Sequence, residues 1–225
     1  MGLQERPELK LASHGRKVTK FGKSTAEIEG LVAATGLSLL IRCSVETGDR
    51  GLLSAFVERW HAETSSFHLP VGEMTITLDN IASLLHIPVM GVFHSYEQID
   101  VGEAITLLVD LLDVNVAEAE AETTQCHGAY VRLSWLREIY FRLCESRHWL
   151  LAARAYMLYL VVGCTLFANK SATHIGVQFL EPFRDIDELV GFAWGAGALV
   201  HMYEHLSYAS KHHGKHLAGY ITILQ

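Results

Sequence analysis

The sequence predicts a mainly α-helical fold, a single globular multi-helix domain that carries one short β-hairpin. Apolar residues recur at three- and four-residue spacing in several segments, as they do along the buried face of a helix. One short stretch, residues 67–78, alternates apolar and polar side chains around a turn, which indicates a hairpin. The chain of 225 residues is 50% hydrophobic, which is enough for one large core without a second domain.

The segment between residues 49 and 88 carries the densest pattern. Asp49 can cap a helix that we expect to end near Ala62, with inward positions at Leu52, Leu53, Phe56, Val57 and Trp60. The hairpin that follows is expected to bury one face, formed by Phe67, Leu69, Met74 and Ile76. Thr77 can cap a second helix, which Pro88 must end. The expected apolar stripe of that helix is Leu78, Ile81, Leu84 and Leu85.

Shorter patterns predict the remaining elements. We expect a short helix and turn within residues 28–41, a helix over 103–114 and a helix capped by Ser134. Residues 116–124 are rich in Ala and Glu, and we expect an exposed helix end or loop there. Further along, the patterns predict a strand or extended turn at 177–180, a helical turn at 185–190, and helices over 194–207 and 217–224. Small residues at the start of the 194–207 helix indicate a close crossing in the core.

Residues 149–168 form the most apolar segment, and about twenty residues are what a membrane-spanning helix needs. Arg154 interrupts the segment near its start, and an arginine within the hydrocarbon core of a membrane is costly. Amphipathic helices are expected before and after it. We therefore predict a central helix that its neighbours bury, and no membrane association.

Charge is distributed unevenly along the chain. Residues 1–23 carry a net charge of +4, which leaves −11 for the remainder of a chain whose total is −7. We expect residues 1–25 to form a flexible basic arm and residues 26–225 to form the folded domain. One alternative function is nucleic-acid binding through this arm, with phosphate contacts from Arg16, Lys17, Lys20 and Lys23.

Two other patterns suggest chemistry. His201, Glu204 and His205 fit an H-x-x-E-H motif, in which both imidazoles can face one zinc ion and the carboxylate can act as general base. A metal-dependent hydrolase is therefore a second alternative function, although no third ligand is evident. Cys126 and His127 are adjacent, but an isolated pair rarely forms a metal or nucleophile site. We predict no catalytic activity, no bound metal and no cofactor.

Several segments together resemble one known family. They are GLLSAFVERWHAETSSFHLPVGEMTITLDNIASLLHIPVMG at residues 51–91, RLSWLREIYF at 132–141, RAYMLYLVVGCTLFANKSATHI at 154–175, FAWGAGALVHMYEHL at 192–206 and HLAGYITILQ at 216–225. In this order they resemble the plant mobile domain, the module of maintenance-of-meristems-like and transposon-encoded plant proteins that has also been described as aminotransferase-like. His61 and Ala62 stand where the family usually has Arg-Pro. The family pattern continues beyond Gln225, so we expect the C-terminal end of the domain to be missing.

The resemblance implies a nuclear protein with a role in transposon silencing, gene expression, genome integrity and meristem maintenance. It also implies phosphatase-like nuclear proteins as partners. Because the sequence contains no complete set of catalytic residues, we predict a non-catalytic protein-interaction module. Its candidate partner surface is Glu58, Arg59, His68 and Glu73, the polar residues of the 51–91 segment. The competing structural interpretation is that the segment packs the hairpin on its helix through Trp60, Phe67, Leu69 and Met74.

Overall fold

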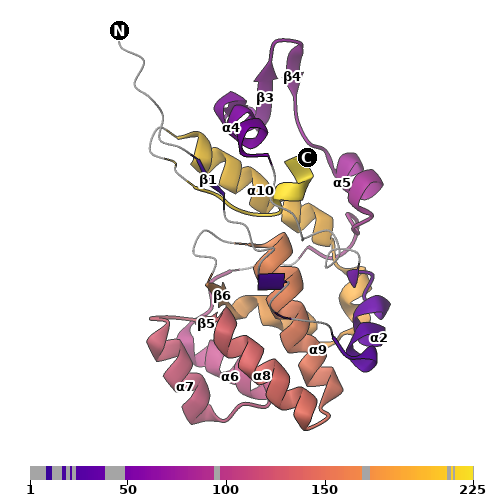
Figure 1. Cartoon of the computed structure of the whole chain (residues 1–225), viewed down its shortest axis with the longest axis vertical. Helices are drawn as coiled ribbons and strands as arrows, with labels where there is room; N and C mark the ends of the chain where they lie inside the picture. Colours follow the sequence, from indigo (N-terminus) through magenta and orange to yellow (C-terminus); the bar gives the residue numbers. More distant parts are fainter. Residues whose placement is uncertain are drawn as a thin grey trace.

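Helices form most of the structure, and the strands are short (Figure 1). The computed structural model describes residues 9–11, 17–18, 21, 24–38, 49–93, 97–168, 173–211, 214 and 216–224. The prediction of a mainly α-helical fold is confirmed. In Figure 1, α6, α7, α8 and α9 form the lower part of the molecule, while α10, α4 and the β3–β4 hairpin form the upper part.

The lower part begins with two helices that carry side-chain caps. In α6 (Val101–Leu112), the Asp100 carboxylate accepts a hydrogen bond from the Glu103 backbone N–H, and the Glu103 side chain accepts one from the Asp100 N–H. Asn115 caps α7 (Val116–Gln125). Each cap satisfies backbone donors that the first helical turn leaves unpaired. Residues 116–124 are thus a full helix rather than a loop, and Glu122 within it is buried.

The two helices that follow form the centre of the lower part. Arg132 flanks the N-terminus of α8 (Leu133–Glu145) without a side-chain cap, so the predicted Ser134 cap is wrong. The next helix, α9 (Trp149–Met157), continues as a π-helix, η1 (Leu158–Leu166). Within the described residues, Trp149–Leu166 is the one helical stretch long and apolar enough to cross a membrane, and 83% of it is buried inside the protein. It packs as the central helix that the sequence predicts.

Short strands and 3-10 helices connect this centre to the upper part. Strand β5 (Tyr130–Arg132) pairs antiparallel with β6 (His174–Gly176). The 3-10 helices η2 (Val177–Arg184) and η3 (Asp187–Gly191) follow. The predicted strand or extended turn at 177–180 is therefore wrong, because the strand lies three residues earlier and residues 177–184 form a 3-10 helix that contains Pro182.

The upper part contains the 49–88 segment. Asp49 caps α4 (Arg50–Arg59), and Thr77 forms a reciprocal capping box with Asn80 on α5 (Leu78–Leu85), as predicted. The first helix ends at Arg59 rather than Ala62. The next two residues form β2 (Trp60–His61), which pairs with β3 (Ser66–Leu69), and β3 pairs with β4 (Gly72–Met74). The expected hairpin is thus the larger part of a three-stranded sheet.

The longest described α-helix, α10 (Trp194–Ser210), contributes side chains to the hydrophobic cores of both parts. Its N-terminal half contributes Trp194 and Ala198 to the large core cluster around α6, α8, α9 and η1. Its C-terminal half contributes Met202 and Leu206 to a smaller cluster with Leu53, Val57, Trp60 and Phe67. The predicted final helix over 217–224 is wrong, because these residues form the end of β7 (His216–Leu217) and a short 3-10 helix, η4 (Ile221–Leu224).

The described N-terminal residues pack against the folded body. Strand β1 (Lys10–Leu11) pairs in parallel with β7, and Leu9 is buried. Phe21 is buried against the rings of Tyr140, Phe141, Tyr156 and Tyr159. We expected residues 1–25 to form a solvated arm, but these described residues are packed, because their apolar side chains complete a core. Helix α2 (Ala26–Ala34) follows and packs on α9.

Candidate interaction surfaces

The aromatic residues of the 49–88 segment build the smaller core. The Trp60 Nε1 donates a hydrogen bond to Ser207 Oγ of α10 at 3.0 Å, and its ring lies 4.9 Å from the Phe67 ring and 5.0 Å from the Tyr203 ring. Trp60 and Phe67 are buried, and Leu69 packs against the same cluster. Met74 is 55% exposed, so its predicted burial is wrong. The structural interpretation of the segment is therefore confirmed for its aromatic residues and not for Met74.

The four predicted partner-surface residues lie on three elements, α4, β3 and β4. Glu58 is exposed near the end of α4, and the neighbouring Arg59 donates a hydrogen bond to Ala55 O on its own helix at 3.1 Å. His68 and Glu73 are opposite each other on β3 and β4, with 3.4 Å between His68 Nε2 and Glu73 Oε1. The structure thus brings His68 and Glu73 together. Their role in binding a partner stays a prediction.

The hairpin also carries a stack of two imidazole rings. The His61 and His68 rings are 3.6 Å apart and nearly parallel. The pKa of Glu73 is lowered mainly because its carboxylate accepts a hydrogen bond from the Ser66 hydroxyl. The nearby His68 lowers this pKa further. The side chains of Ser66, His68 and Glu73 therefore form a polar cluster on the outer face of the sheet. This cluster favours an anionic Glu73 at neutral pH.

An exposed apolar surface lies beside α5. Val92 N donates to Gly191 O at 2.8 Å, and Ala193 N donates to Val92 O at 3.0 Å, which joins residues 90–93 to residues 190–193. We call the large apolar side chains of these two segments the apolar patch, and each is between 54% and 81% exposed: Met90, Val92, Phe93 and Val190. An exposed apolar patch of this kind commonly marks an interaction site.

Sequence patterns did not reveal the apolar patch. Leu84, on the preceding helix, was expected on the buried stripe of α5 and is 75% exposed, while Ile81 of the same stripe is buried. No Asp, Glu, Lys or Arg occurs between Asp79 and Glu97, and this long uncharged stretch is the one sequence signal that could have indicated the surface. The pairing of residues 90–93 with residues 190–193 also depends on Gly91. Its φ is +136°, and a Cβ atom introduced by substitution at this position would lie 2.1 Å from Gly191 O.

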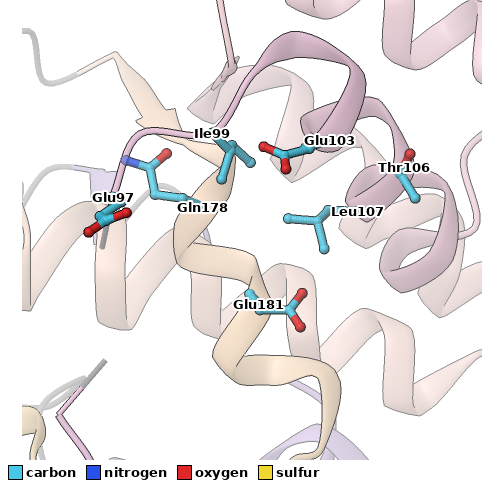
Figure 2. Close-up of a pocket in the computed structure, with 7 residues that line it drawn as sticks. All are labelled: Glu97, Ile99, Glu103, Thr106, Leu107, Gln178 and Glu181. Carbon is cyan, nitrogen blue, oxygen red and sulfur yellow. The ribbon is translucent and has the colours of Figure 1, made fainter. Parts of the chain in front are cut away.

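A pocket of about 390 Å³ opens between α6 and η2 (Figure 2). Ile99 and Leu107 supply its apolar surface, and Figure 2 shows the carboxylates of Glu97, Glu103 and Glu181 around them. Glu103 also caps α6, and Glu181 also pairs with Arg184 at 2.9 Å. We call this site the acidic pocket. Its lining combines apolar contact with negative charge, and such a lining suits the stem and head of a lysine or arginine side chain.

The H-x-x-E-H motif does not assemble a metal site among the described residues. His201 is partly buried, its Nε2 lies 3.3 Å from Ala168 O, and its ring packs on Phe167 and His205. Burial lowers the pKa of His201 below its ordinary value of 6.5. Glu204 is exposed. In the part of the chain that the structure describes, no group of three or more His, Cys, Asp or Glu side chains is arranged to hold a metal ion.

Cys126 is also unsuited to nucleophilic chemistry. Burial and the neighbouring Glu122 carboxylate raise the pKa of its thiol to about 11, so the thiol is protonated at neutral pH. Its Sγ donates to Glu122 Oε1 at 3.5 Å. Of the predicted nucleic-acid contacts, Arg16, Lys20 and Lys23 lie outside the described residues. Lys17 is described, and its Nζ is buried rather than presented to solvent.

Comparison with known proteins identifies the fold family. The family model of the plant mobile domain matches residues 36–225. The chain belongs to this family. No solved structure matches the chain.

Several proteins of Arabidopsis thaliana are similar to this chain. Protein MAIN-LIKE 2 is 34% identical over 230 residues, covering 99% of this chain and 32% of that protein. Protein MAINTENANCE OF MERISTEMS is 32% identical over 212 residues, covering 90% of this chain and 42% of that protein. Serine/threonine-protein phosphatase 7 long form homolog is 34% identical over 184 residues, covering 79% of this chain and 13% of that protein. The chain thus spans less than half the length of these relatives.

Proposed function

We propose that this plant mobile domain is a non-catalytic protein-interaction module, and that the apolar patch is its docking surface. Met90, Val92, Phe93 and Val190 are held by paired backbone segments, so they form a fixed surface rather than a loose loop. Burying such side chains against a partner releases about 25 cal/mol per Å² of apolar area. The exposure of the apolar patch is the observation that carries the proposal.

The acidic pocket suggests the chemistry of the partner. Its three carboxylates occur in a chain whose net charge is −7, so electrostatic steering favours a basic partner. A partner that presents both large apolar residues and a lysine or arginine would complement both surfaces. Aromatic and arginine side chains are the ones most often found as anchors in such interfaces.

We infer a phosphatase-like nuclear protein as the class of partner. One relative that contains a similar segment carries the name of a serine/threonine-protein phosphatase homolog. Two segments that are joined in one protein can also bind each other when they belong to separate chains. A phosphatase-like protein is therefore a candidate partner of this domain. The nuclear setting and the role in transposon silencing, gene expression and genome integrity follow from the family resemblance and belong to the same proposal.

A substitution within the apolar patch tests the proposal. The tagged chain and its Met90→Asp and Val116→Asp variants are incubated with nuclease-treated plant nuclear extract, and bound proteins are identified by mass spectrometry. Val116 is a matched control, because it is also exposed and apolar but lies on α7. We expect a phosphatase-like protein to bind the original chain and the Val116→Asp variant, and to be lost with Met90→Asp.

Two results would contradict the proposal. Equal recovery of the same protein by all three folded chains would exclude the apolar patch as the docking surface. Recovery of the protein from a parallel sample of untreated extract, but not from the nuclease-treated extract, would instead support the nucleic-acid alternative. Circular dichroism of each variant before the experiment shows whether the substitution has changed the fold.

A further inference from the structure

The two helices that form the acidic pocket each present a row of side chains to it. On α6, Glu103, Thr106 and Leu107 are spaced by three and four residues, which places them on one face of the helix. On η2, Gln178 and Glu181 are three residues apart, and side chains at this spacing lie one above the other in a 3-10 helix. Figure 2 shows the two rows on opposite sides of the pocket, with Leu107 between the carboxylates of Glu103 and Glu181. The acidic pocket therefore has an apolar floor and a carboxylate on each side.

The α6 side of the acidic pocket offers acceptors but no cation. Glu103 accepts a hydrogen bond from the Asp100 backbone N–H at 3.1 Å, and within the described residues no basic side chain forms an ion pair with it. A carboxylate has about four acceptor positions, so most of those on Glu103 remain available. The Thr106 hydroxyl donates its hydrogen to Gly102 O at 3.0 Å, which leaves its oxygen able to accept. A donor that enters the pocket can therefore bond to both side chains.

The η2 side of the acidic pocket favours lysine over arginine as the donor. Both carboxylate oxygens of Glu181 already accept from Arg184, from Nε at 2.9 Å and from Nη2 at 3.1 Å. This planar two-bond geometry is the one that an incoming guanidinium would need. A lysine ammonium is compact and needs only single oxygens. Arginine also stacks well on aromatic rings, and none is present among the described lining residues.

We propose that the acidic pocket receives a lysine side chain of the protein partner, and that acetylation of this lysine prevents its binding. The inference rests on the proposed function, because the lysine belongs to the partner that docks on the apolar patch. The aliphatic stem lies on Ile99 and Leu107, and the ammonium group donates to Glu103 and Thr106. The volume of about 390 Å³ is within the range of sites for small groups.

Acetylation changes the features of the lysine that the acidic pocket recognises. It removes the positive charge and leaves a single N–H donor in place of three. The bulkier neutral group would then displace water from Glu103 without supplying a cation in return, which is costly for a carboxylate. The same pocket therefore makes docking dependent on the modification state of the partner.

Titration of the whole isotope-labelled chain, followed by NMR, tests the site. The probes are blocked peptides in which a central lysine, acetyllysine, arginine or norleucine is flanked by glycines. We expect the lysine peptide to shift the backbone amide signals of Thr106, Leu107 and Gln178 in a saturable way. It should bind about tenfold more tightly than the acetyllysine and norleucine peptides, since these lack the charge-assisted hydrogen bonds. The arginine peptide should bind more weakly than the lysine peptide.

Glu103→Gln removes the charge and keeps the fold, because glutamine also serves as the acceptor in a capping box. It should weaken binding of the lysine peptide by about tenfold and leave binding of the norleucine peptide unchanged. Glu120→Gln is the matched control, since Glu120 is exposed on α7 and does not line the pocket. It should bind all four peptides as the original chain does.

Three outcomes would overturn the inference. The lysine peptide leaves the signals of Thr106, Leu107 and Gln178 unchanged, the acetyllysine or arginine peptide binds as tightly as the lysine peptide, or Glu103→Gln binds the lysine peptide as the original chain does. The peptides contain no large apolar residue for the apolar patch beyond the one tested in the pocket. Their binding therefore reports on the acidic pocket, whereas partner recovery by Met90→Asp reports on the apolar patch, so failure of one proposal is distinguishable from failure of the other.

Discussion

At the scale of single residues, the ion pair of Glu122 and Arg132 is the most consequential polar contact. Glu122 is only 2% exposed, and its Oε1 accepts hydrogen bonds from the Arg132 backbone N–H at 2.7 Å and from Arg132 Nε at 3.0 Å. The pair ties α7 to β5 directly before α8 begins. It therefore positions α8, the third helix of the lower part.

We expect Glu122→Ala to lower the free energy of unfolding by about 3–5 kcal/mol, because it leaves the arginine and a buried backbone N–H without their acceptor. Urea denaturation followed by circular dichroism measures the change. Glu120→Ala, two residues away and exposed, should change stability by less than about 0.5 kcal/mol. Equal effects of the two substitutions would contradict the role of the pair.

The same carboxylate has a predictable pH dependence. Burial alone would raise the pKa of Glu122, but the hydrogen bonds and charge of Arg132 outweigh burial and lower it below 4.5. The stability from the pair is therefore fully present above pH 4.5 and is lost as pH falls through the lower value of the folded state. The stability difference between the original chain and Glu122→Gln should shrink in this acidic range when denaturation is repeated across pH.

His201 should give stability a second pH dependence at milder acidity. Burial lowers its pKa in the folded chain, against smaller opposing contributions from Ala168 O and Glu204, while the unfolded chain binds a proton near 6.5. The unfolded state thus takes up more protons, and stability should fall as pH drops below 6.5. Titration of the imidazole signals by NMR checks this directly. A His201 that titrates at or above 6.5 would refute the prediction.

At the scale of elements, the crossing of α10 and α5 depends on one glycine. Gly195 N donates to Pro88 O at 2.7 Å. A Cβ at Gly195 would lie 2.8 Å from Ile81 Cγ2 and 2.9 Å from Val89 Cγ1. The small residues at the start of this helix thus allow the close approach that the sequence predicts, and they hold the segment that leads to the apolar patch.

Gly195→Ala should destabilise the protein by about 1–3 kcal/mol, the usual effect of overpacking a core contact. Gly30→Ala makes the same chemical change in α2, where nothing lies within 4 Å of the added Cβ. It should stabilise the protein by about 0.5–1 kcal/mol, because alanine restricts the unfolded chain more than glycine does. Thermal denaturation of both variants is the measurement, and effects of the same sign would contradict the close crossing.

At the scale of the whole molecule, α10 couples two cores. Trp194 and Ala198 pack in the large cluster, and Met202 and Leu206 pack in the smaller one. The Trp60 side chain of the smaller cluster also bonds to Ser207 of this helix, 147 residues further along the chain. A rigid helix shared by both cores should make them unfold together.

Met202→Ala should therefore cost about 2–5 kcal/mol and lower the stability of both cores, although Met202 packs in the smaller one. Far-ultraviolet circular dichroism reports all helices, and tryptophan fluorescence reports the surroundings of residues such as Trp60 and Trp194. The two unfolding transitions should coincide before and after the substitution. A variant with separated transitions would show that α10 does not couple the cores.

The sequence by itself determined the features that depend on neighbours a few residues away. Asp49 and Thr77 cap their helices as predicted, because a cap needs only backbone donors two or three residues further on. The apolar run 149–166 indicated a buried central helix, since hydrophobicity over so long a run permits few alternatives. The ordered match of several segments to the plant mobile domain also indicated the family.

Only the tertiary structure decided which apolar side chains are covered and which polar ones are buried. Met74 and Leu84 fit the buried face of their elements by periodicity, yet both are exposed, because among the described residues no distant segment covers them. Glu122 lies in a stretch that the sequence predicts to be exposed to solvent, yet Arg132 and the surrounding fold bury its carboxylate. The apolar patch and the acidic pocket arise in the same way, because their residues come from segments far apart in the chain and local patterns contain no information about such contacts.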